Sequence, residues 1–210
     1  MTSYEHFMLG VTGTVAAGLH RRFGWPIAAA AGLAAVAPDW DGLSLAFGAA
    51  AFDRVHRAWG HNLAAAALLG AIIAALEYRF GWIAGAGRRL SSKLKLPESG
   101  RVGVGFTART LGGWGAWLGV GTAASLSHVA TDMLFSGHAT LSDWGIRLLW
   151  PFSERAWVYP MVSWGDPAVS ILFAAGMLAM AWRPERVQRT AAVTLAAVIA
   201  YVFIRGWAPH

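Results

Sequence analysis

The stretch AASLSHVATDMLFSG, residues 123–137, decides how the whole chain is interpreted. It is apolar enough to lie in a membrane helix, yet it carries His128 and Asp132 one helical turn apart, on one face. An unpaired carboxylate within a span costs at least about 2.5 kcal/mol, so such residues commonly mark function. Two explanations account for the pair. A divalent cation could offset the buried charge, or a His–Asp hydrogen bond could simply join two helices.

The composition is typical of an integral membrane protein. Of 210 residues, 56% are hydrophobic and only 13% are charged, whereas a soluble domain carries about 25% charged residues. There is no cysteine, which excludes disulfides, thiolate nucleophiles and Cys-type zinc sites. The first ten residues lack a basic region, so no cleaved signal peptide is predicted.

Six helical segments are predicted. A membrane span needs about 20 apolar residues, and four blocks approach that length: 62–83, 110–134, 165–182 and 190–206. Two shorter blocks, 6–19 and 24–37, flank His20-Arg21-Arg22 and predict a tight hairpin that either crosses the membrane or re-enters it. The expected fold is all-α, a polytopic membrane helical bundle. It forms one domain over residues 1–210, with a basic cytoplasmic loop at about 84–106.

The distribution of charge predicts the orientation. Twelve of the 17 Lys and Arg residues fall in the connections around 20–22, 79–109 and 183–189, and five fall on the other side. The positive-inside rule places the first side in the cytoplasm. Most acidic residues, and every histidine except His20, fall on the outer side. We therefore expect a site at the outer membrane interface, and no nucleic-acid partner despite the net charge of +6.

Four separate segments bring histidine or aspartate to this outer level. The candidate ligands are His6, Asp39, Asp41, His56, His61, His128 and Asp132. His56 and His61 would lie about 140° apart on an ideal helix, so they converge only if one lies in the preceding loop, where Gly60 permits a break. Pro38-Asp39-Trp40-Asp41 taken alone is more typical of a capping turn. Nitrogen and carboxylate ligands suit zinc, with manganese or iron as substitutes, and seven candidates allow one or two ions.

These motifs, in this order, resemble the YdjM-like family of LexA-binding, inner-membrane-associated metal-dependent hydrolases. The matching elements are Glu5-His6, Pro38-Asp39-Trp40-Asp41, His56-Arg57 with His61, Ser127-His128 with Asp132-Met133-Leu134, Gly137 with Leu148-Leu149-Trp150-Pro151-Phe152, and Asp166. The resemblance covers residues 5 to about 166. One stretch departs from it: the family reads Thr-His-Ser where this chain has Gly60-His61-Asn62. The resemblance implies a membrane-bound, metal-dependent hydrolase.

The function expected is therefore hydrolysis at the outer leaflet of the inner (plasma) membrane, on the periplasmic or extracellular side. A metal-activated water would attack a phosphoester or a lipid-like substrate. Asp39 or Asp41 could act as general base, and Arg57 could hold an anionic ester, although Arg57 could equally pair with Asp53 or a lipid headgroup. Two alternatives stay open: a metal or proton transporter, and a non-catalytic membrane protein with a structural metal site.

Overall fold

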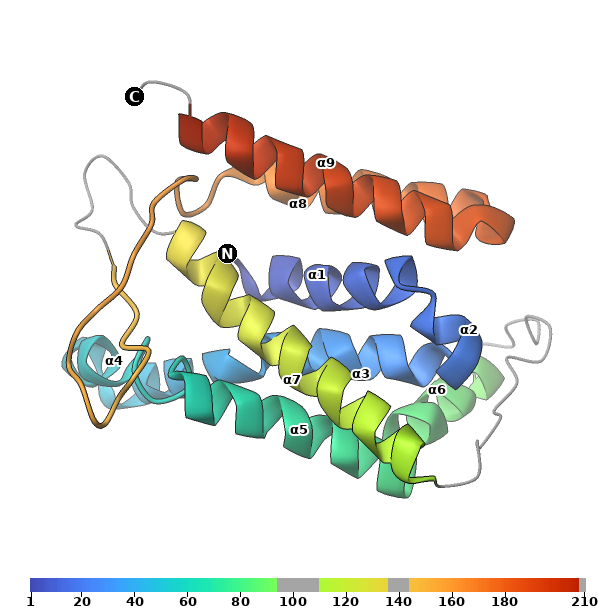
Figure 1. The fold of residues 1–210 in the computed structure, drawn as a ribbon, viewed down its shortest axis with the longest axis horizontal. Helices are drawn as coiled ribbons and strands as arrows, with labels where there is room; N and C mark the ends of the chain where they lie inside the picture. The colour runs from blue at the N-terminus through green and yellow to red at the C-terminus, as the bar shows by residue number, and fades with distance from the viewer. Residues whose placement is uncertain (94–109, 136–143, 208–210) are drawn as a thin grey trace.

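The chain folds into helices, as its composition predicts. The computed structural model describes residues 1–93, 110–135 and 144–207 (Figure 1). Within these ranges the elements are α1 (Ser3–Ala16), α2 (Leu19–Phe23), α3 (Trp25–Val36), the 3-10 helix η1 (Ala37–Phe47), α4 (Ala49–Val55), α5 (Leu63–Phe80), α6 (Trp82–Lys93), α7 (Leu111–Leu134), α8 (Pro167–Trp182), the 3-10 turn η2 (Pro184–Arg186) and α9 (Val187–Trp207). The all-α prediction is confirmed.

Each of the six predicted segments coincides with one long helix: α1, α3, α5, α7, α8 or α9. The first begins three residues earlier than predicted because Thr2 and Glu5 form a capping box. The Thr2 hydroxyl accepts from the Glu5 N–H at 3.4 Å, and the Glu5 carboxylate accepts from the Thr2 N–H at 2.8 Å. The connection predicted at residues 20–22 is itself helical and forms most of α2.

Two of the helical stretches are candidate membrane spans. Among the described residues, Leu63–Phe80 and Pro184–Trp207 are long and apolar enough to cross a bilayer, and Pro167–Trp182 is apolar but shorter. Their outer faces expose large apolar side chains, including Leu68 at 61% and Ile204 at 68%. Rows of such residues are expected on a surface that faces lipid.

The basic connection predicted at about 84–106 is described only in its first part. Residues 82–93 form α6, which places Arg88, Arg89 and Lys93 on one short helix. Its start is fixed by the buried Glu77, whose carboxylate accepts from the N–H groups of Ile83 at 2.6 Å and Ala84 at 3.2 Å. The remainder, 94–106, lies outside the described residues.

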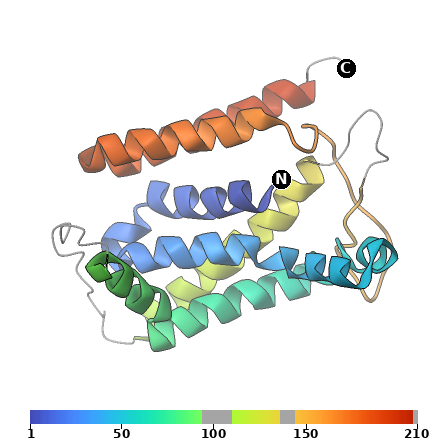
Figure 2. The same cartoon turned by 180° about the vertical axis from the view of Figure 1, so that it is seen from behind.

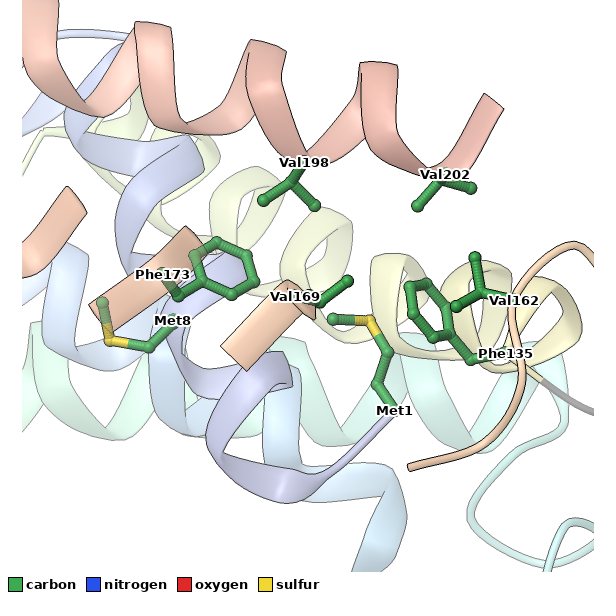
Figure 3. Packing of buried hydrophobic residues seen from close by; sticks show 8 residues of the cluster. All are labelled: Met1, Met8, Phe135, Val162, Val169, Phe173, Val198 and Val202. Atoms are coloured by element: carbon green, nitrogen blue, oxygen red, sulfur yellow. The ribbon is translucent and has the colours of Figure 1, made fainter. Parts of the chain in front are cut away.

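The helices pack in layers. Helices α8 and α9 lie side by side over α1, while α3 and α5 lie beyond α1 and α7 crosses them obliquely (Figures 1 and 2). An apolar cluster ties the α8–α9 pair to α1 and to the end of α7 (Figure 3); its members are Met1, Met8, Phe135, Val162, Val169, Phe173, Val198 and Val202. The hydroxyl of Ser170 on α8 also donates to Glu5 on α1 at 2.7 Å. These contacts hold the first turns of α1, and hence His6, in a fixed place.

Close approach of α5 and α7 depends on two glycines. A Cβ added to Gly70 would overlap the backbone of Gly121, and one added to Gly121 would overlap the backbone of Gly70. We expect Gly121→Ala to lower the free energy of unfolding by about 1–3 kcal/mol, the usual cost of overpacking. Gly115→Ala is the matched control, because no atom of the described residues lies within 4 Å of its added Cβ. Thermal unfolding in detergent measures both, and equal stability of the two variants would contradict the packing.

Candidate metal site

The seven predicted ligands contact one another in two overlapping groups and through His6. The start of α1 lies near the end of α7 in the ribbon (Figure 1). His6 lies near the start of α1, and Asp39 and Asp41 lie on η1. His56 caps α4, and His61 follows in the turn before α5. His128 and Asp132 occupy the last two turns of α7, so helical periodicity aims both at the same point.

Four of these residues enclose one point, and we call them the tetrad: Asp39, His61, His128 and Asp132. The two imidazole Nε2 atoms of His61 and His128 are 3.1 Å apart. Oδ1 of Asp39 lies 3.7 Å from the first and 3.4 Å from the second. Oδ2 of Asp132 lies 3.5 Å and 3.6 Å from the same two atoms. The tetrad therefore presents two nitrogens and two oxygens at nearly uniform spacing.

This spacing fits a tetrahedral cation. Zinc binds imidazole and carboxylate ligands at about 2.0–2.2 Å, so two ligands of a tetrahedral ion lie about 3.3–3.6 Å apart. The separations of 3.1–3.7 Å in the tetrad bracket that value. His61, His128 and Asp132 are buried, whereas the Asp39 side chain is 24% exposed. The tetrad could hold a metal ion, and Asp39 is its one member that is not fully buried.

The imidazoles are oriented by groups behind them. The Nδ1 of His128 lies 2.7 Å from the carbonyl oxygen of Ala35, and the Nδ1 of His61 lies 3.1 Å from Oδ2 of Asp41. An Nδ1–H that donates to such an oxygen leaves Nε2 unprotonated and free to bind a metal. Both rings thus present the nitrogen that a cation requires.

Asp41 contacts Gly60 and His56 in the neighbouring loop and is not a member of the tetrad. It is 1% exposed, and its carboxylate accepts from the Gly60 N–H at 2.8 Å and lies 2.8 Å from Nδ1 of His56. Asp41, His56 and His61 form a second group that could hold an ion. Because their separations of 2.8 and 3.1 Å are those of hydrogen bonds, these three residues already satisfy one another.

His6 lies against the tetrad from the α1 side. Its ring stacks on that of His128 with centroids 3.6 Å apart, and its Nε2 lies 2.9 Å from Oδ1 of Asp132. The amino group of Met1 donates to the same oxygen at 2.7 Å. Oδ1 of Asp132 is thus engaged by α1, which leaves Oδ2 facing the tetrad.

Arg57 lies buried at the opposite edge, in a backbone conformation with φ 61°. Its Nη2 lies 3.6 Å from Oδ2 of Asp132, and its guanidinium stacks 4.7 Å from the ring centroid of Trp144 while donating to the Trp144 carbonyl. Among the described residues its ion pair is therefore with Asp132, so the predicted alternative pairing with Asp53 is wrong. Its Nε is buried with no hydrogen-bond partner in the described part of the chain.

The protonation of the loop residues follows from these contacts. Burial opposes ionisation of Asp39, but its hydrogen bond to His128 outweighs that effect, and the pKa of Asp39 is lowered to about 2. Burial also disfavours the charged form of His61, but its hydrogen bonds to Asp132 and Asp41 raise the pKa of His61 to about 9. In the metal-free protein a protonated His61 therefore balances the carboxylates, and a cation would displace that proton.

Several residues that contact the site were not predicted from the sequence. The Ser3 hydroxyl donates to Oδ2 of Asp39 at 2.8 Å, and the Thr131 hydroxyl lies 3.4 Å from Nδ1 of His6. Thr131 stands between His128 and Asp132, so its position in the motif is a usable hint. The Ala35 carbonyl and the Trp144 ring give none, because every residue has a carbonyl and this chain has 12 tryptophans.

Asp41 is expected to tune metal affinity without binding the ion. Asp41→Asn should weaken binding by about 10–100-fold, the usual effect of removing a carboxylate that orients a ligating imidazole. Competition with a chelator of known affinity measures the change. Asp53→Asn removes an exposed carboxylate from the nearby α4 and should leave the affinity unchanged. Equal affinities in both variants would contradict this role of Asp41.

One of three comparisons with known proteins gave a match. A family model described as YdjM inner membrane protein matches residues 1–209. No match was found among curated proteins or among solved structures.

Proposed function

The chain belongs to the YdjM inner membrane protein family, and from that premise we propose that it is a metal-dependent hydrolase of phosphoesters. The observation that carries the proposal is the convergence of three buried ligands, His61, His128 and Asp132, whose separations of 3.1–3.6 Å suit three positions around one tetrahedral cation. Zinc is the expected metal, and manganese or iron are substitutes with the same ligand chemistry.

We assign the three buried members of the tetrad, His61, His128 and Asp132, to the metal. Catalytic zinc sites commonly use three protein ligands and keep a fourth position open. When bound, the cation would supply charge that acidifies a water and polarises the ester. Asp39 is the partly exposed member, so its carboxylate is the best placed to accept the proton of the attacking water. Attack forms one P–O bond and breaks the ester P–O bond, and the proton held by Asp39 passes to the departing alkoxide.

Arg57 is assigned to the anionic oxygens of the substrate. Its unpartnered Nε leaves a donor for an oxyanion beside the tetrad, and guanidinium binds planar pairs of oxygens well. Its stacking on Trp144 and its contact with Asp132 hold the group in place before substrate arrives.

The surroundings support a membrane enzyme with its site at the outer interface. We propose that the α1–α3 hairpin, α5, α7, α8 and α9 all lie within the bilayer, around the two candidate spans. The excess of Lys and Arg in the connections at the end opposite the tetrad then orients that end to the cytoplasm. The tetrad accordingly faces the periplasmic or extracellular side.

Asp39→Asn separates catalysis from metal binding. The variant should keep its metal, because three ligands remain, and should lose about 100–10,000-fold in kcat, the range for a general base. Hydrolysis of bis(p-nitrophenyl) phosphate and p-nitrophenyl phosphate by zinc-loaded protein in detergent measures kcat. Ser44→Ala, at an η1 residue whose hydroxyl donates to the local Asp41 carbonyl at 2.6 Å, is the control. Unchanged turnover in Asp39→Asn would refute the assigned base, and no turnover by metal-loaded wild type with either ester would refute the proposed activity.

A further inference from the structure

A cavity of about 260 Å³ lies between helices that also carry His6 and His128, and it plays no part in the chemistry above. It opens between α1, α7 and α9. Its lining includes Leu9, Gly13, Val120, Ala123, Ser127 and Leu195. We call this cavity the chain pocket. Its walls are almost entirely apolar, so it cannot bind a charged headgroup.

The chain pocket continues from the site along the same helix faces. Gly10 lies four residues after His6 on α1, and Ala124 lies four residues before His128 on α7; both line the pocket. Residues four apart on a helix lie one above the other, so the pocket begins one turn from the stacked His6 and His128 rings. Thr131 lies between the chain pocket and His6, because its hydroxyl donates to the carbonyl of the pocket residue Ser127 at 2.8 Å and lies 3.4 Å from Nδ1 of His6.

The dimensions of the chain pocket suit a hydrocarbon chain. Its α7 wall, residues 120–127, extends about 10 Å at 1.5 Å per residue. The hydrocarbon of one leaflet is about 15 Å deep, half of a 30 Å core. Gly13 keeps the space open, because nothing in ranges 1–93, 110–135 and 144–207 lies within 4 Å of a Cβ added there. The pocket is thus apolar and extends from one turn beyond His6 and His128 toward the other end of α1 and α7.

We propose that the chain pocket holds one hydrocarbon chain of a lipid whose phosphoester is presented to the tetrad. This proposal rests on the proposed hydrolase function and deepens it, because it assigns the substrate to lipids and gives the pocket the task of selecting the chain. A headgroup bound at the tetrad and a chain bound along α1 and α7 would together place the ester bond beside Asp39. A diacyl phosphatidate and a polyprenyl phosphate share this chemistry.

The test uses lipid capture as its first readout, so it does not depend on turnover. The full-length protein in detergent is labelled with a phosphatidate carrying a diazirine in its acyl chain, and separately with a polyprenyl phosphate carrying the same group. The labelled peptides are then identified by mass spectrometry. Wild type is expected to label within residues 9–14 and 120–127, with one of the two lipids labelling more strongly and thereby identifying the chain type. Gly13→Phe and Ala123→Phe, which fill the pocket from α1 and from α7, should each reduce that labelling by at least about tenfold, because the added ring occupies the space that the chain would fill.

Two controls separate the possible outcomes. Gly119→Phe adds the same ring on an exposed part of α7 outside the pocket and should leave the labelling intact. His128→Ala should also keep the labelling while losing metal, so capture and hydrolysis fail independently. With an active enzyme, Gly13→Phe should raise KM for the lipid and leave hydrolysis of bis(p-nitrophenyl) phosphate unchanged. Labelling that is confined to the exposed faces of α5 and α9, or that is unaffected in both filled variants, would overturn the proposal.

Discussion

Replacing His128 by alanine is expected to remove the bound metal. The substitution deletes one of the two imidazole nitrogens of the tetrad, and the loss in affinity should exceed about 100-fold, the upper end for residues that merely orient a ligand. It also leaves the Asp132 and Asp39 carboxylates with one less partner in a largely buried space. Elemental analysis of detergent-purified protein, wild type against variant, measures the metal content directly.

The control for His128→Ala is another buried histidine at the far end of the molecule. His20 lies on α2, is 8% exposed and packs against the Trp25 ring with centroids 5.0 Å apart. His20→Ala removes an imidazole of similar burial but should keep the metal. If His128→Ala kept its metal, or if His20→Ala lost it equally, the tetrad would not be the binding site.

The same variant distinguishes the three functional classes. A hydrolase loses metal and turnover together while the helices stay folded. A structural metal site loses metal together with thermal stability, and the wild type hydrolyses neither ester. A transporter moves metal or protons across proteoliposomes, and His128→Ala stops that flux. The described part of the chain gives transport little support, because the buried Glu77 at the other end is engaged by the N–H groups of α6.

The helices could be predicted because their signals are local. Apolar blocks set the positions of α5, α7, α8 and α9, and the four-residue spacing of His128 and Asp132 fixes their common direction on α7. The start of α1 was missed by counting apolar residues, since the helix begins in the polar capping box of Thr2 and Glu5. Short-range patterns therefore suffice where the chain is regular.

Which residues bind the metal and which orient the imidazoles could not be predicted in the same way. It depends on which nitrogen of each ring turns toward which oxygen, and this is set by loops that bring distant segments together. His61 lies between two carboxylates, with Nδ1 toward Asp41 and Nε2 toward the tetrad. The sequence shows Asp39 and Asp41 as equivalent neighbours, yet η1 buries one behind His61 and leaves the other partly exposed. The hydrogen-bond partner of His128 Nδ1 is the backbone carbonyl of Ala35, and any residue type can supply a backbone carbonyl.

Gly60→Ala is expected to disrupt the site without altering any candidate ligand. A Cβ at this position would overlap the carbonyl oxygen of Pro38, which belongs to η1. Backbone atoms cannot move aside as a flexible side chain can, so the turn that carries His61 must shift away from η1. That shift would also break the 2.8 Å hydrogen bond from the Gly60 N–H to Asp41. We expect metal affinity to fall by at least about 100-fold, because both His61 and the carboxylate that orients it are displaced.

Gly42→Ala is the control for Gly60→Ala. Gly42 lies on η1, and the nearest atom to a Cβ added there is Nδ1 of His56 at 3.8 Å, an ordinary contact. Gly42→Ala should therefore bind metal like the wild type, whereas Gly60→Ala should not, although the two changes are chemically identical. Isothermal titration with zinc measures both affinities, and circular dichroism shows whether the helices persist. If Gly60→Ala bound zinc as tightly as Gly42→Ala, the close approach of the two loops would not be what assembles Asp39 and His61 into one site.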